Sequence, residues 1–169
     1  MLGKDYENQD CALARTLEAI GERWTLLIIR DAFYGVRRFS ELQAHLDIPK
    51  AVLSDRLSGL VDDGILNRRP DPDHAGRHLY ELTTAGRDLW PAVSELLAWG
   101  SRHRATHTRV FTHAACGTAL EGSYCPKCEL NPPPDAVVAE PGASRRQPRE
   151  DPVAVALRRP HRLLEPLQT

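Results

Sequence analysis

The sequence predicts a mainly α fold with a small β wing, an α+β class, because three patterns follow one another between Arg37 and Leu82. A short helix begins near Phe39. A second helix follows Pro49, and a two-stranded hairpin with basic flanks occupies residues 65–82. Two helices joined by a tight turn and followed by a hairpin form a winged helix-turn-helix, so the expected partner is double-stranded DNA.

The two helices of this unit are predicted from their ends and from their apolar spacing. Ser40, followed three residues later by Gln43, fits a capping box at the start of the first helix. Pro49 occupies a position that is favoured at a helix start, and Gly64 provides an end for the second helix. Apolar residues between them recur at helical spacing, which predicts a buried stripe of Leu53, Leu57, Leu60 and Val61.

A buried stripe on the second helix leaves the opposite face free to meet base edges in a major groove. The residues on or beside that face are Lys50, Ala51, Ser54, Asp55 and Ser58. Lysine can donate to guanine or phosphate, serine is an adaptable donor, and aspartate can accept from a cytosine amino group. Arg56 lies at the edge of the stripe, where it either reaches a phosphate or forms an internal salt bridge. Further predicted contacts flank the unit, namely Arg37, Arg38, Ser40, Arg68, Arg69, Arg77 and His78.

Apolar spacing also predicts helices on both sides of the winged unit. Residues 13–20 and 24–34 are expected to form two core helices. A long amphipathic helix is predicted after the hairpin, ending near His103, and Pro91 is expected to kink it or to reset its start. The apolar face of this helix needs a partner. A second copy of the chain is the predicted one, giving a homodimer, and folding back onto its own domain is the alternative.

Composition and charge restrict the partners and the location. Lys and Arg together number 22 against 23 Asp and Glu, a formal net charge of −1, so bulk charge does not indicate a polyanion ligand. Any DNA affinity must therefore come from where the charges are placed. No run of about 18 apolar residues is present, and the N-terminus lacks a signal-peptide pattern, so we expect a cytoplasmic protein without a membrane partner.

A cluster of potential metal ligands follows the long helix. The pattern His113-x2-Cys116-x8-Cys125-x2-Cys128 has the spacing of a small zinc site. Three thiolates and one imidazole make a closed set with no open position for catalysis, so the predicted cofactor is a structural Zn²⁺ ion. The alternative is a ribbon that no longer holds metal, because a small misplacement of one ligand breaks tetrahedral geometry.

These patterns divide the chain into four parts. Residues 1–10 are polar and are expected to be a flexible N-terminus. Residues 11–104 form the winged domain with its dimerisation helices, and residues 105–130 form a zinc-ribbon-like module. Residues 131–169 are rich in proline and arginine, which predicts a disordered tail.

The winged domain resembles the HxlR family of bacterial transcriptional regulators over roughly residues 10–104. The matching positions are Cys11, 16–17, 20–21, 24–28, 37–42, 53–57, 63–66, 80–83, Gly86 and 99–100. The resemblance implies a dimer that joins through its terminal helices and binds a pseudo-palindromic operator. Residues 108–130 resemble the zinc-ribbon-like extension of some members of the family. The turn at residues 70–76 departs from the family because it is acidic and lacks a proline pair, which argues against insertion of the wing tip into the minor groove.

Some members of that family sense oxidants through the cysteine equivalent to Cys11. Asp10 precedes this cysteine and Arg15 follows one turn later, so its environment is ambiguous, and a small buried side chain is the alternative. The predicted function is a sequence-specific DNA-binding repressor, with an unidentified small molecule or oxidant as effector. A redox- or metal-linked adaptor, whose winged domain contacts proteins, is the alternative. An enzyme is not predicted, because the sequence has no glycine-rich phosphate loop, paired carboxylates or His-x-Glu deaminase pattern.

Overall fold

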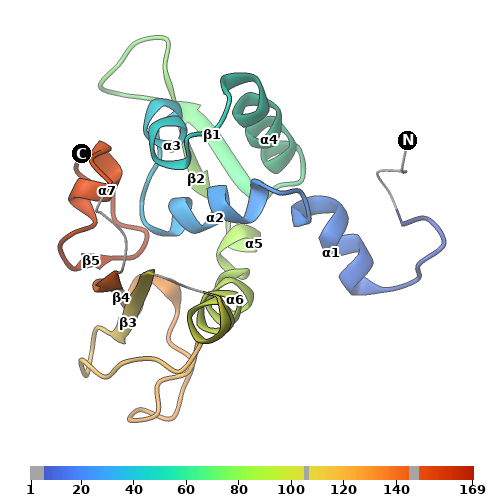
Figure 1. The fold of residues 1–169 in the computed structure, drawn as a ribbon. Coiled ribbons are helices and arrows are strands. Elements are labelled where there is room, and N and C mark those ends of the chain that lie inside the picture. The colour runs from blue at the N-terminus through green and yellow to red at the C-terminus, as the bar shows by residue number, and fades with distance from the viewer. Residues whose placement is uncertain (1–5, 105–106, 145–148) are drawn as a thin grey trace.

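The winged helix-turn-helix lies at the centre of the computed structural model, which describes residues 6–104, 107–144 and 149–169 (Figure 1). Its helices are α1 (Ala12–Ile20), α2 (Thr25–Phe33), α3 (Phe39–Leu46), α4 (Lys50–Asp62), α5 (Thr84–Arg87) and α6 (Trp90–His103). The wing consists of β1 (Leu66–Pro70) and β2 (His78–Leu82), which pair antiparallel. The predicted α+β class and the winged architecture are therefore confirmed.

The ends of these helices follow the predicted signals with two corrections. The capping interaction of α3 comes from Glu41, whose carboxylate accepts from the backbone N–H of Arg38 at 3.2 Å, so the predicted Ser40–Gln43 box is wrong. Pro49 is the N-cap of α4 and not its first residue. Pro91 lies in the first turn of α6 and resets the start of that helix. The first turn does not use its backbone N–H groups within the helix, so the N–H that proline lacks is not missed there.

The apolar stripe of α4 is buried in the same hydrophobic core as α2. Leu53, Leu57 and Leu60 are at most 1% exposed, and Phe33 of α2 is fully buried. Each such side chain contributes about 1.5–3 kcal/mol through burial. The stripe predicted from helical spacing is therefore the face that orients α4, and its opposite face points to solvent.

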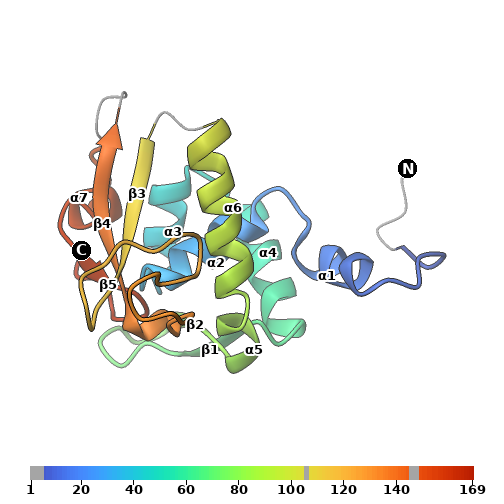
Figure 2. The ribbon, with the colours of Figure 1, turned by 90° about the horizontal axis from the view of Figure 1, so that it is seen from below.

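Residues after α6 form a second layer beside the winged unit (Figure 2). Strands β3 (His107–His113), β4 (Val137–Ser144) and β5 (His161–Arg162) make an antiparallel sheet in the order β3-β4-β5. A short 3-10 helix (Pro134–Ala136) precedes β4, and α7 (Pro152–Ala156) precedes β5. Phe111 of β3 packs against Trp90 of α6, with ring centroids 5.3 Å apart.

The prediction of a disordered tail over residues 131–169 is wrong for residues 131–144 and 149–169. These segments carry six apolar side chains that are at most 8% exposed: Val137, Ala139, Val153, Leu157, Leu163 and Leu167. They lie in short apolar stretches separated by runs rich in proline, arginine and acidic residues, so the composition of the segment resembles that of a disordered chain. The buried side chains belong to the same core as the winged unit.

Backbone hydrogen bonds tie the last residues to the end of α2. The N–H of Leu164 donates to the carbonyl of Phe33 at 2.8 Å, and the N–H of Leu167 donates to the carbonyl of Gly35 at 3.1 Å. Arg37 adds a side-chain hydrogen bond to the carbonyl of Leu164 at 2.9 Å. We call residues 163–169 the C-terminal strap.

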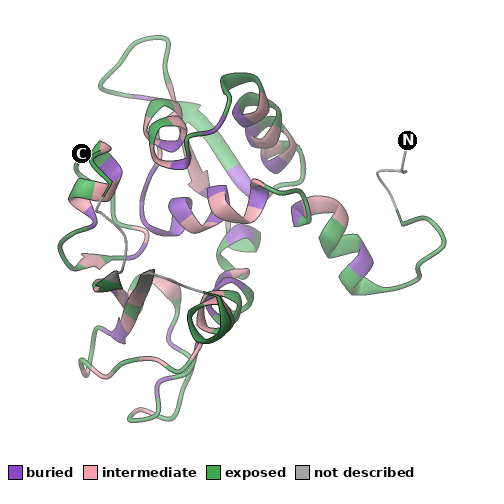
Figure 3. Ribbon diagram, in the orientation of Figure 1, coloured by how far each residue is buried: buried purple, intermediate pink, exposed green. Residues whose placement is uncertain are grey.

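Helix α1 projects away from the rest of the chain, and most of its surface is exposed (Figures 1 and 3). Leu13 and Leu17 are 64% and 41% exposed, so the prediction that both flanking helices are core helices holds for α2 and not for α1. Residues 1–5 of the predicted flexible N-terminus lie outside the described residues. Within the described part of the chain, no helix has the length and apolar character needed to cross a membrane.

Candidate DNA interface and metal centre

The solvent-facing side of α4 carries the residues that the sequence predicts as base readers. Lys50, Ala51, Ser54, Asp55 and Ser58 are all exposed. Arg56 is half-buried and lies near two carboxylates, 3.2 Å from Asp55 and 3.7 Å from Glu22. Of the two alternatives for Arg56, the structure shows the internal salt bridge.

A groove of about 450 Å³ lies between the start of α4 and the wing. It is lined by residues from the start of α3, the start of α4 and the return side of the wing: Arg38, Phe39, Ser40, Lys50, Gly76, Arg77, His78 and Tyr80. Five predicted DNA-binding residues therefore come together here from three elements. Among the described residues, Lys50 and Arg77 form no ion pair, so their charges remain available to an external anion.

Of the other wing arginines, Arg69 is paired with a carboxylate and Arg68 contacts a histidine ring. Arg69 makes a bidentate contact with Glu81 at 2.7 and 2.8 Å, and Arg37 approaches the same carboxylate at 2.6 Å. The guanidinium of Arg69 lowers the pKa of the Glu81 carboxyl. Arg68 lies 3.1 Å from the ring nitrogen of His78. Glu81 was not predicted as part of the site, although the hairpin register places it diagonally across from Arg69.

Arg38 anchors the base of the wing turn. Its guanidinium contacts the buried carboxylate of Asp71 at 3.0 Å, and the N–H of Asp73 donates to the same carboxylate at 3.0 Å. Burial alone would raise the pKa of the Asp71 carboxyl, but these two partners outweigh burial and lower the pKa. Asp71 thus has a structural role that the sequence pattern did not reveal, since an acidic turn residue is usually solvated.

Cys11 occupies the N-cap of α1, and its side chain is exposed. The buried alternative is therefore wrong. The backbone N–H groups of Ala14 and Leu13 lower the pKa of the thiol, and Arg15 acts in the same direction. Exposure and a lowered pKa are the two properties that thiol reactivity requires.

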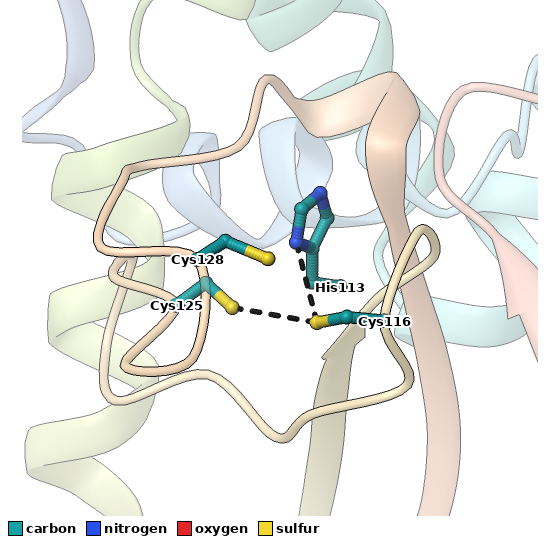
Figure 4. A group of neighbouring side chains, drawn as sticks. All are labelled: His113, Cys116, Cys125 and Cys128. Atoms are coloured by element: carbon teal, nitrogen blue, oxygen red, sulfur yellow. Dashed lines mark hydrogen bonds between the residues drawn. The ribbon is translucent and has the colours of Figure 1, made fainter.

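The four predicted metal ligands converge on one point in the zinc-ribbon-like module (Figure 4). Their donor atoms, from His113, Cys116, Cys125 and Cys128, all lie within 4.8 Å of one another. The Sγ of Cys116 is 3.6 Å from the Sγ of Cys125 and 3.5 Å from the Nδ1 of His113. A tetrahedral zinc ion holds two sulfurs about 3.8 Å apart, and a sulfur and a nitrogen about 3.5 Å apart, given its usual bond lengths. The ligand set therefore fits such an ion.

The ionisation of the thiols also fits a cation site. Hydrogen bonds from the hydroxyl and the backbone N–H of Thr118 lower the pKa of Cys116 to about 6. The hydrogen bond that Cys128 shares with Cys116 raises the pKa of Cys128 to about 11. One thiolate thus opposes formation of the next, and a divalent cation at the centre would remove that repulsion.

Two tight turns and one helix hold the cluster in place. The N–H groups of Cys116 and Gly117 donate to the carbonyl of His113 at 3.1 and 2.8 Å, which forms the first turn. The second turn closes when the N–H of Cys125 donates to the carbonyl of Leu130 at 2.8 Å. Glu95 of α6 accepts from the N–H of Ser123 at 3.1 Å and so attaches the loop between the turns to the winged domain.

Comparison with known proteins places the winged unit among helix-turn-helix regulators. The model of the HxlR-like helix-turn-helix family matches residues 19–108. Rv3095 of Mycobacterium tuberculosis, an uncharacterized HTH-type transcriptional regulator, is 50% identical over 92 residues, which cover 54% of this chain and 58% of that protein. The chain thus spans just over half the length of this curated relative.

Two solved structures share the fold. PA1607, described as a candidate transcription factor, is 31% identical with a TM-score of 0.63, over 71% of this chain and 86% of that one. The oxidized form of the redox regulator HypR is 30% identical with a TM-score of 0.52, over 56% of this chain and 99% of that one.

Proposed function

The chain belongs to the HxlR-like helix-turn-helix family, and from that premise we propose that it is a sequence-specific DNA-binding transcriptional regulator that acts as a homodimer. The observation that carries the proposal is the groove beside α4. Lys50 of α4 and Arg77 of the wing line it and form no ion pair within the described part of the chain, and Ser54 lies on the exposed face of α4. This arrangement suits a phosphate backbone running between the reading helix and the wing.

The groove also accounts for DNA binding by a chain without a basic net charge. Arg37 and Arg69 share Glu81, so this trio contributes one net positive charge and not two. We therefore assign the principal backbone contacts to Lys50 and Arg77, and base reading to Ser54, Asp55 and Ser58. We propose that the chain represses transcription by occupying a pseudo-palindromic operator.

Replacing Lys50 with alanine should weaken binding to a duplex taken from the region upstream of the gene. A base-edge contact contributes about 1–3 kcal/mol, which corresponds to a loss of roughly 5- to 150-fold in affinity. If Lys50 contacts a phosphate instead, the slope of log affinity against log salt should fall by about 1. Fluorescence anisotropy at several salt concentrations measures both quantities, and Ser54→Ala tests the neighbouring reader.

Lys127→Ala is the matched control, because it removes the same side chain from an exposed position in the zinc-ribbon-like module. The control should bind DNA as the wild type does. In the adaptor alternative, the winged domain contacts proteins and neither substitution changes DNA affinity. Equal weak binding by all three proteins would therefore support an adaptor and exclude the regulator.

The proposed dimer rests on apolar side chains that α1 and α6 leave in solvent. Leu13 and Leu17 of α1 are 64% and 41% exposed, and Leu96 and Trp99 of α6 are 54% and 49% exposed. Large apolar side chains left exposed on a helix indicate an interaction surface. A second copy of the chain is the partner we propose, through the terminal helices as the family resemblance implies.

Leu17→Ser should dissociate this dimer. In a two-fold dimer the substitution occurs in both halves of the interface, so two buried leucines are lost. The free energy of association should weaken by about 3–6 kcal/mol, which raises the dissociation constant about 10²- to 10⁴-fold. Analytical ultracentrifugation gives the constant directly. Leu130→Ser serves as control, since Leu130 is 44% exposed but lies in the zinc-ribbon-like module. A wild-type chain that sediments as a monomer at micromolar concentration would contradict the dimer.

We propose zinc as the ion at the cysteine cluster, held by His113, Cys116, Cys125 and Cys128. A closed set of three thiolates and one imidazole leaves the ion a purely structural role, in which it fixes two turns that have few apolar contacts of their own. Cys11 remains a predicted redox sensor, supported by its exposure and by the likeness to HypR. Mass spectrometry of the alkylated thiol before and after peroxide treatment would test that role.

A further inference from the structure

A cavity of about 1170 Å³ lies between α6, β3 and the segment that contains α7. Its apolar lining includes Tyr34, Leu97, Phe111, Leu120 and Leu157. Its basic lining is His45, which contacts Asp151, and six arginines: Arg30, Arg102, Arg104, Arg109, Arg149 and Arg158. Two glutamates, Glu95 and Glu121, also line it, and Glu95 already accepts a hydrogen bond from Ser123. Three of the arginines are paired with carboxylates, Arg30 with Asp31, Arg149 with Asp151 and Arg158 with Glu150. With Glu95 and Glu121 counted against the other three arginines, the lining keeps an excess of one positive charge.

Two of these arginines lie against the ring of Tyr34, which also lines the cavity. The guanidinium carbon of Arg30 lies 5.9 Å from the ring centroid, and that of Arg109 lies 5.3 Å from it. Arg30 is neutralised by the buried carboxylate of Asp31, at 2.7 Å. Phe111 stacks beside the same tyrosine, with ring centroids 6.5 Å apart.

Arg109 has no such partner. Its guanidinium donates to the backbone carbonyl of Leu157 at 3.0 Å, and among the described residues no carboxylate forms an ion pair with it. Burial lowers the pKa of Arg109, and the charge on Arg30 acts in the same direction. A guanidinium remains charged even so, which leaves Arg109 as a partly desolvated cation facing an apolar cavity.

We propose that this cavity binds an organic carboxylate with an aromatic or branched apolar body. The carboxylate supplies the counter-ion for Arg109, whose planar guanidinium can hold it with two parallel hydrogen bonds. The apolar body packs against Phe111, Leu97 and Leu157. The volume exceeds the usual range of about 300–1,000 Å³ for small-molecule sites, so a ligand of two or more rings fits.

The cavity is lined by residues of both the winged domain and the C-terminal layer. Arg30 and Tyr34 belong to α2 and the turn after it, Leu97 to α6, and Arg109 to β3. A bound carboxylate would thus link the winged domain to the C-terminal layer. The proposal concerns binding alone and does not depend on whether the chain binds DNA.

The test is isothermal titration of the full chain with three acids and their neutral amides, namely benzoate with benzamide, 2-naphthoate with 2-naphthamide, and octanoate with octanamide. Each amide keeps the shape of its acid but lacks the charge. We expect at least one acid to bind at one site per chain and at least tenfold more tightly than its amide. Arg109→Gln should reduce binding of that acid about 10- to 100-fold, as loss of a charged hydrogen bond predicts, and leave binding of the amide unchanged.

Three further variants keep the result interpretable. Arg109→Lys keeps the charge and should recover part of the affinity. Arg102→Gln alters an exposed residue at the edge of the cavity, so it tests the charge excess without disturbing packing. Arg87→Gln, an exposed arginine on α5 outside the cavity, should bind as the wild type does. Absence of binding by all three acids at 1 mM, or equal binding of acid and amide, overturns the proposal.

Discussion

Cys125→Ser is expected to abolish metal binding and to unfold the zinc-ribbon-like module. The Cys125 sulfur is fully buried and lies 3.6 Å from the Cys116 sulfur, so serine would replace the central thiolate ligand with a poorer one. The free energy involved is large, because structural zinc in small peptides binds with an apparent free energy of about 10–16 kcal/mol near neutral pH. The module has little apolar core that could hold its two turns together without the ion.

Elemental analysis of the purified protein should give about one zinc per chain for the wild type and almost none for Cys125→Ser. Hydrogen exchange should then show loss of protection over residues 113–130, while α2 to α5 stay protected. Cys11→Ser is the control, since it makes the same chemical change at an exposed cysteine outside the cluster. A wild-type chain that contains no metal after purification in the presence of zinc would exclude the metal centre.

Treatment with a chelator should have the same effect as Cys125→Ser, and its pH dependence has a definite sign. Protons compete with the metal for the thiolates, so lower pH should favour metal release.

The winged unit was predictable from sequence because its signals are local. The stripe of leucines on α4 fixes which face is buried, and the glycine at position 64 ends the helix with a φ of 68°. The metal ligands were predictable for a similar reason, since two short spacings bring four donors together without any knowledge of the rest of the chain. Both predictions depend only on residues that are close in sequence.

The C-terminal layer was not predictable because its contacts are distant in sequence. Strand β4 pairs with β3, so that Val137 lies opposite His113, and the apolar residues that it buries are too sparse to form a recognisable pattern. The pairing of the wing arginines was also hidden. Arg69 and Glu81 lie on different strands, and only the hairpin register shows that each neutralises the other.

Gly35→Ala is expected to detach the C-terminal strap from the winged domain. Gly35 has a φ of +79°, and a Cβ atom at this position would lie 1.7 Å from the carbonyl oxygen of Glu165. A left-handed conformation alone costs an alanine about 1–2 kcal/mol. Relief of the clash would also expose Leu163 and Leu167, each of which contributes about 1.5–3 kcal/mol through burial. We expect the free energy of unfolding to fall by at least about 3 kcal/mol.

Gly76→Ala is the matched control for Gly35→Ala, because it introduces the backbone strain of a left-handed alanine without the steric clash. Gly76 has a φ of +75°, nearly that of Gly35, but no atom lies within 4 Å of its added Cβ. Urea unfolding should therefore show a loss of only about 1–2 kcal/mol for Gly76→Ala. Hydrogen exchange should show lost protection at Leu164 and Leu167 in Gly35→Ala alone, because their N–H groups donate to Phe33 and Gly35. Equal stability of the two variants would mean that the strap does not pack against Gly35, and the second layer would then have to be held by β3 and β4 without it.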